Sequence, residues 1–161
     1  MTNINFYCIE EDINQFLHTF LTNVVVENKK KVIIYSEHQE KIDKLDDALW
    51  AMKKTSFLPH LKIDDKGFEE TPLLISNRLE NPINADFLLI SNFLDNKEFL
   101  NNFDKIFYIF SPMSQQLIDY AKNSWEKYKN MGFELNFIKK DLNNKWQTNK
   151  DFFKFKNSQL F

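Results

Sequence analysis

The sequence predicts a single α/β domain in which helices flank a mostly parallel sheet. Strand-like and helix-like segments alternate over residues 4–52, which is the pattern of β-α-β units built on parallel strands. The strand candidates are short, continuous apolar runs, as expected of strands that are buried on both faces. The length of 161 residues fits one domain better than two.

The first third of the chain predicts two strands and two helices. We expect strands at residues 4–9 and 32–35, because both segments are short apolar runs. Residues 11–28 carry apolar side chains at helical spacing, at Ile13, Phe16, Leu17, Phe20, Leu21, Val24 and Val25. A second amphipathic helix is expected at about residues 40–52. The two β-α units predict parallel strands joined by right-handed crossovers.

The remainder is less regular but continues the same pattern. We expect strands at residues 72–75, 87–90, 106–110 and 133–138, with a further short strand at 61–65 and a short helix at 96–103. A long helix should begin after Ser114 as N-cap, run to about residue 130 and end at Gly132. Residues 1–140 would form the domain and residues 141–161 a C-terminal extension rich in Asn, Lys and aromatic residues. Whether that extension packs as a helix or depends on a partner is left open.

Composition excludes several classes of protein. The net charge of −2 argues against a protein whose main affinity is for the nucleic-acid backbone. Cys8 is the single cysteine, so no internal disulfide can form, and this suits a reducing, cytoplasmic compartment. We expect neither a signal peptide nor a membrane span, because the apolar runs are too short.

The residue types needed for chemistry are not arranged for it. The first β-α turn, at residues 10–12, is acidic and lacks the glycines of a phosphate-binding loop. No metal-ligand spacing connects the histidines (His18, His38 and His60) with each other or with Cys8. The adjacent carboxylates of Asp46 and Asp47 are expected to be solvated surface charges. We therefore expect no metal, no cofactor and no catalytic residues.

Two stripes of side chains on the long helix carry more information. Leu117, Ala121, Ser124 and Tyr128 form one stripe, which we expect to be the buried face. The second stripe comprises Ile118, Lys122, Trp125 and Lys129. A partly exposed tryptophan beside cations is typical of an interface that binds an acidic, hydrophobic peptide. Spacing alone slightly favours the alternative, a tryptophan at the edge of the core with lysine lying over it.

Several motifs, in order along the chain, resemble the chi subunit family of bacterial DNA polymerase III. They are LDDALWAMKKTSFLPH at residues 45–60 and WEKYKNMGF at residues 125–133, supported by Phe6-Tyr7 and Thr71-Pro72-Leu73. The resemblance covers roughly residues 4–137. It implies a Rossmann-like, three-layer α/β domain with no catalytic activity of its own. Its partners in that family are a psi subunit of the clamp-loader complex and the acidic C-terminal tail of single-stranded DNA-binding protein (SSB).

The resemblance also implies two sites. Lys122 would bind the terminal carboxylate of the SSB tail, and further tail-binding positions are Trp125, Ile118, Ser111, Pro112 and Lys129. The surface facing psi or another partner would include Trp50, Phe57 and Pro59. Because Lys122 replaces an arginine of the family, weaker tail binding is expected. Two alternatives stay open: an adaptor for another repair or helicase protein, and an α/β enzyme with an unrecognised site.

Overall fold

The middle layer of the molecule is a single eight-stranded sheet. The computed structural model describes residues 2–52 and 58–152. Within them the strands are β1 (Asn3–Cys8), β2 (Val32–Tyr35), β3 (Leu61–Lys62), β4 (Leu73–Ser76), β5 (Phe87–Ile90), β6 (Lys105–Phe110), β7 (Glu134–Lys140) and β8 (Trp146–Asn149). Their order across the sheet is β3-β4-β2-β5-β6-β1-β7-β8. Described neighbours pair in parallel, except for the antiparallel pair β7 and β8. The predicted mostly parallel sheet is confirmed.

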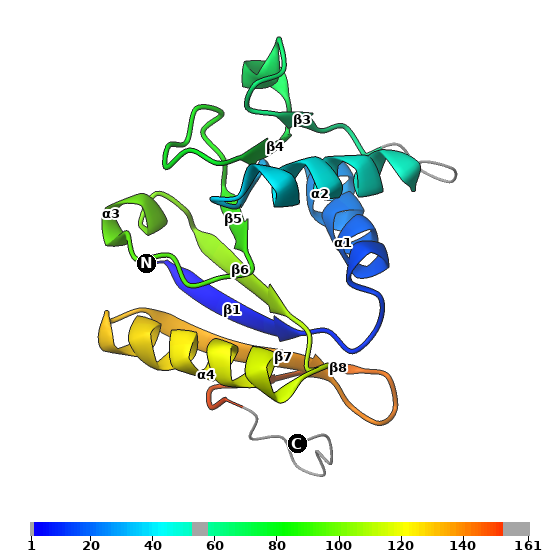
Figure 1. Ribbon diagram of the computed structural model, residues 1–161. Coiled ribbons are helices and arrows are strands. Elements are labelled where there is room, and N and C mark those ends of the chain that lie inside the picture. Colours follow the sequence, from blue (N-terminus) through cyan, green and yellow to red (C-terminus); the bar gives the residue numbers. More distant parts are fainter. Residues whose placement is uncertain (1, 53–57, 153–161) are drawn as a thin grey trace.

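Helices cover both faces of this sheet (Figure 1). On one face lie α1 (Ile13–Leu21), which continues as the π-helical segment η1 (Thr22–Glu27), and α2 (Gln39–Ala51). On the other face lie α3 (Lys97–Leu100) and the long helix α4 (Gln115–Asn130). A short 3-10 turn, η2 (Phe68–Glu70), precedes β4. The predicted single three-layer α/β domain is therefore confirmed.

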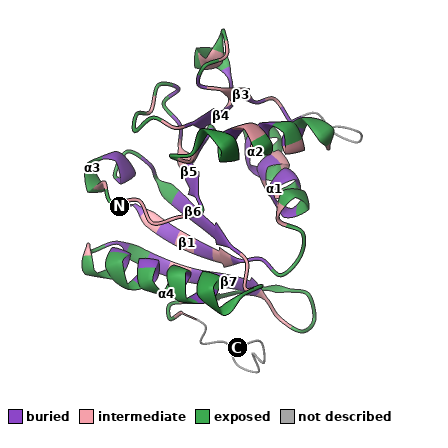
Figure 2. Cartoon of the chain, viewed as in Figure 1, coloured by how far each residue is buried: buried purple, intermediate pink, exposed green. Residues whose placement is uncertain are grey.

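The alternation of side chains along β1 explains the two cores. Ile4, Phe6 and Cys8 point to the face covered by α3 and α4. Tyr7 and the following Ile9 point to the opposite face, covered by α1 and α2. Successive residues of a strand project to opposite faces, so a strand in the centre of a covered sheet must be apolar at nearly every position. Figure 2 shows mostly buried residues along β5 and β6, whereas β1 alternates between buried and intermediate positions.

The ends of the long helices are fixed by local chemistry. The Asp12 carboxylate accepts a hydrogen bond from the Gln15 amide at 3.0 Å, and the Ser114 hydroxyl accepts one from the Leu117 amide at 3.2 Å. Both are N-cap bonds that satisfy amides lacking an intrahelical partner. Gly132 follows α4 with φ of +90°, a conformation that glycine adopts without steric cost. The predicted caps at Ser114 and Gly132 are confirmed.

One strand lies beyond the last strand that the sequence predicts. Strand β8 begins at Trp146 and pairs with the end of β7, so the part of the chain expected to form an extension contains a strand of the sheet. Its sequence, WQTN, has a single large apolar residue, because β8 is an edge strand with most of its side chains exposed. Among the described residues, no helix is both long enough and apolar enough to span a membrane.

Candidate functional site

Helix α4 buries three of the four residues expected on its inner face, Ala121, Ser124 and Tyr128, and the fourth, Leu117, is exposed. Its buried side chains are Ile118, Ala121, Ser124, Trp125 and Tyr128, whereas Leu117 is 46% exposed. Trp125 is only 3% exposed and belongs to the core. Its ring packs edge-on against Phe6 at 5.1 Å between ring centroids. The expected burial of Leu117 was wrong. For Trp125, the structure bears out the alternative that spacing slightly favoured, a tryptophan packed in the core, where it faces β1 and β7.

Two tyrosine hydroxyls connect α4 to its surroundings. The Tyr128 hydroxyl donates to the Leu94 carbonyl at 3.0 Å and accepts from the Leu94 amide at 2.7 Å. The Tyr108 hydroxyl on β6 lies 3.1 Å from the Ser124 hydroxyl. Burial raises the pKa of Tyr108 to about 12 and also raises the pKa of Tyr128. Both phenols are therefore neutral at physiological pH and fix α4 on the sheet.

Two exposed cations flank the buried Trp125. Lys122 lies three residues before Trp125 and Lys129 four residues after it, so all three lie on the same side of α4. Both lysines are exposed. The half-buried Ser111 and Pro112 connect β6 to this helix. The expected tail-binding residues thus lie on α4 and the segment leading into it, with the cations outside and the apolar side chains inside.

The sequence did not predict that Phe152 packs against the core beneath α4. Phe152, which follows β8, stacks on Phe110 with an interplanar angle of 15° and a centroid distance of 6.0 Å. The same ring lies 4.9 Å from that of Phe137 and 5.6 Å from that of Trp125. The concentration of phenylalanines in the C-terminal segment was the available signal, but its contacts are tertiary and have no periodicity.

A second candidate surface surrounds Trp50 at the end of α2. Trp50 is 36% exposed, and its ring lies 4.5 Å from that of the buried His60. His60 Nδ1 donates to the Leu58 carbonyl at 2.7 Å, and its Nε2 lies 3.4 Å from an Asp46 carboxylate oxygen. Pro59 is half-buried beside them, whereas Phe57 lies outside the described residues. Asp46, expected to be a solvated charge, is instead buried against His60.

The pair of Asp46 and His60 should make stability depend on pH. Burial raises the pKa of Asp46, and this outweighs the opposing effects of His60 and Lys62. Because the pKa of Asp46 is higher in the folded state, the carboxyl contributes its full stabilisation at pH values below its ordinary pKa of 3.8. That stabilisation is lost as the pH rises through the folded-state pKa.

The replacement Asp46→Asn removes this titration but keeps a side chain that can donate to His60 Nε2. We expect it to become more stable relative to the unmodified protein as the pH is raised from acid to neutral. Urea unfolding over this range measures the difference. The exposed neighbour supplies the control, because Asp47→Asn should follow the unmodified protein. If the free energies of unfolding of Asp46→Asn and the unmodified protein differed by the same amount at every pH, this account would be contradicted.

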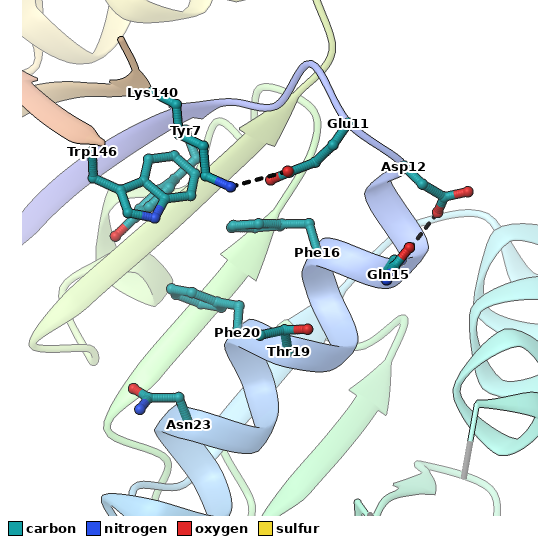
Figure 3. Close-up of a pocket in the computed structure, with 10 residues that line it drawn as sticks. All are labelled: Tyr7, Glu11, Asp12, Gln15, Phe16, Thr19, Phe20, Asn23, Lys140 and Trp146. Carbon is teal, nitrogen blue, oxygen red and sulfur yellow. Dashed lines mark hydrogen bonds and ion pairs between the residues drawn. The ribbon is translucent and has the colours of Figure 1, made fainter. Parts of the chain in front are cut away.

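A third feature is an open groove between α1 and the β7–β8 hairpin (Figure 3). It encloses about 670 Å³ and has an aromatic wall formed by Tyr7, Phe16, Phe20 and Trp146. Lys140 pairs with Glu11 at 3.0 Å, and its ammonium group lies 5.0 Å from the centroid of the Trp146 ring. The cation in this groove is therefore already neutralised by an acid of the same wall.

A fourth feature is a cavity of about 410 Å³ at the carboxyl ends of β2 and β5. After β2 the chain continues to β3 and β4 on one side of this point in the sheet, and after β5 it continues to β6 on the other side. The two connections therefore diverge, as they do at the ligand crevices of open α/β sheets. Its ionisable lining residues are Tyr35, Lys41 and Lys44. Among the described residues, no group of three or more His, Cys, Asp or Glu side chains could hold a metal ion.

These features define a single-domain α/β protein whose candidate sites are built from aromatic side chains and exposed cations. The chain belongs to the DNA polymerase III chi subunit family, because the family model described as "DNA polymerase III chi subunit, HolC" matches residues 1–136. DNA polymerase III subunit chi of Escherichia coli (strain K12) is 26% identical over 143 residues, which are 84% of this chain and 97% of that protein. The family is one of accessory subunits of a replicative polymerase.

Proposed function

We propose that this chain is a non-catalytic, cytoplasmic subunit that links the clamp-loader complex to SSB by binding the acidic C-terminal tail of SSB. One observation carries the proposal: Lys122 and Lys129 are exposed on the side of α4 where Ile118 is buried and Trp125 belongs to an aromatic core. A peptide that ends in acidic residues and an aromatic side chain matches this combination of charges and rings.

The chemistry of the lysines sets the expected strength. An ammonium group attracts a carboxylate but lacks the planar fork with which a guanidinium group binds both oxygens. Lys122 and Lys129 are exposed, so their attraction to a partner is screened by salt. We therefore expect a moderate affinity that falls as the ionic strength rises.

Charge reversal on α4 tests this function. Titrating the full chain into a fluorescently labelled peptide that ends in several acidic residues and Phe should give saturable binding at low salt. Lys122→Glu should weaken it about tenfold or more, since one favourable charge contact becomes repulsive. Lys127→Glu is the matched control, because this exposed lysine lies on the opposite side of the same helix. No binding at low salt, or equal effects of the two substitutions, would refute the proposal.

We assign the surface around Trp50 to a second partner, a psi-like clamp-loader subunit. An exposed tryptophan that rests on a buried histidine is held in a fixed orientation, and such rigid aromatic residues dominate the energy of protein interfaces. Pro59 adjoins it, and Phe57 belongs to the same expected surface although it lies outside the described residues. The two proposed surfaces lie on opposite faces of the sheet, so both partners can bind at once.

A further inference from the structure

The chain places one of its own phenylalanines against the aromatic core that contains Trp125. The ring of Phe152 contacts the rings of Phe6, Phe110, Trp125 and Phe137, with centroid distances of 6.3, 6.0, 5.6 and 4.9 Å. Those four rings belong to β1, β6, α4 and β7, which are fixed elements of the fold. Together they form a seat for one phenyl group, and we call them the aromatic seat.

The aromatic seat is also the place to which the proposed function assigns the tail. Trp125 is 3% exposed while Phe152 is in position, so a partner's aromatic side chain cannot reach the Trp125 ring at the same time. The exposed lysines Lys122 and Lys129 flank the same helix side and remain available for carboxylates. The charged half of the site is thus open, whereas its apolar half is occupied by the chain itself.

Phe152 is less buried than the residues of the seat and follows an edge strand. It lies three residues after the end of β8, an edge strand paired only with β7 among the described strands. The turn before it has a hydrogen bond from the Asp151 amide to the Asn149 side chain at 2.8 Å, and Lys150 forms an exposed ion pair with Glu134 at 3.5 Å. Exposed pairs of this kind contribute little to stability. Phe152 itself is only partly buried, whereas Phe6, Phe110 and Phe137 are buried.

We propose that Phe152 is an intramolecular competitor for the aromatic seat, and that a partner tail binds fully only when its own aromatic side chain displaces Phe152. This regulation rests on the proposed function, because it concerns the same site. The apparent association constant for the tail equals the intrinsic constant multiplied by the fraction of molecules in which the seat is empty. Residues that hold Phe152 in place therefore set the affinity without contacting the tail.

Variants of Phe152 test this competition in the full chain. Phe152→Ala empties the seat, and Phe152→Leu leaves a smaller occupant. We expect affinity for the acidic peptide ending in Phe to rise about tenfold in Phe152→Ala and by less in Phe152→Leu, while thermal stability falls in the same order. Leu142→Ala is the control: this residue is 81% exposed in the turn before β8, and its replacement should change neither quantity. If Phe152→Ala does not fold, the comparison with Phe152→Leu retains the test.

A second probe separates the seat from the proposed partner. N-acetyl-phenylalanine carries only a phenyl group and a carboxylate, and its binding is followed by shifts in nuclear magnetic resonance spectra. It should bind Phe152→Ala, with the shifts at Trp125 and Phe110, and should bind the unmodified chain more weakly. Failure of this probe to bind Phe152→Ala would overturn the competition. If the probe binds at the seat but no acidic peptide binds any variant, the seat and its occupant are supported while the proposed function is refuted.

Discussion

Trp125→Ala is expected to lower the free energy of unfolding by about 3–5 kcal/mol, the range for removing a large aromatic side chain from a core. The indole is 3% exposed and packs on Phe6 and Phe137, so its loss leaves a cavity between α4 and the sheet. The substitution also removes the edge-to-face contacts that the indole makes with Phe6 and Phe137. Urea denaturation followed by circular dichroism measures the change.

The control for this prediction lies on the same helix. Leu117→Ala removes an apolar side chain that is 46% exposed, and it should change stability by about 0.5 kcal/mol or less. A loss below about 1 kcal/mol for Trp125→Ala would show that the indole is not part of the core. The expected loss of stability has a practical consequence: Trp125→Ala cannot serve as a binding variant, so tests of tail binding should rely on Lys122.

Tyr128→Phe is expected to lower the free energy of unfolding by about 1–3 kcal/mol, although it removes a single oxygen atom. The hydroxyl bonds to both the amide and the carbonyl of Leu94, and its removal leaves these two backbone groups without that partner. Little apolar contact is lost, so the effect reports the hydrogen bonds. The midpoint of urea unfolding should fall without a change in the denaturant dependence, and hydrogen exchange at the Leu94 amide should become faster.

Tyr120→Phe is the matched control for that hydroxyl. Tyr120 lies on the same helix and is 47% exposed, so water can replace any bond that its hydroxyl loses. We expect its stability to stay within about 0.5 kcal/mol of the unmodified protein. Equal effects of the two substitutions would contradict the role assigned to the Tyr128 hydroxyl.

The strands that the sequence predicts best are those in the centre of the sheet. Strands β2 and β5 have the bounds expected from their apolar runs, because both faces of each strand are covered by helices. Strand β8 could not be predicted in this way. An edge strand exposes most of its side chains, and its pairing with β7 depends on the turn between them rather than on an apolar pattern.

The candidate site was predictable only in part. Helical spacing correctly predicted that Ala121, Ser124 and Tyr128 are buried, but it misplaced the edge of the buried face, which excludes Leu117 and includes Ile118 and Trp125. Leu117 and Ile118 are about 100° apart around the helix, so where the edge of the buried face falls decides which of the two is buried. The contacts of Asp46 with His60, and of Phe152 with Trp125, join residues far apart in sequence. Such tertiary contacts leave no periodic signal.

The central claim is that a partner's acidic tail binds at Lys122 and the aromatic seat, and a crystal structure of the full chain with a peptide ending in acidic residues and Phe tests it most directly. We predict that the peptide's phenyl ring lies against Phe110 and Trp125, that its carboxylates lie at Lys122 and Lys129, and that Phe152 has left the seat. A peptide bound in the groove of Tyr7 and Trp146, or at Trp50, with Phe152 still in place, would contradict the account.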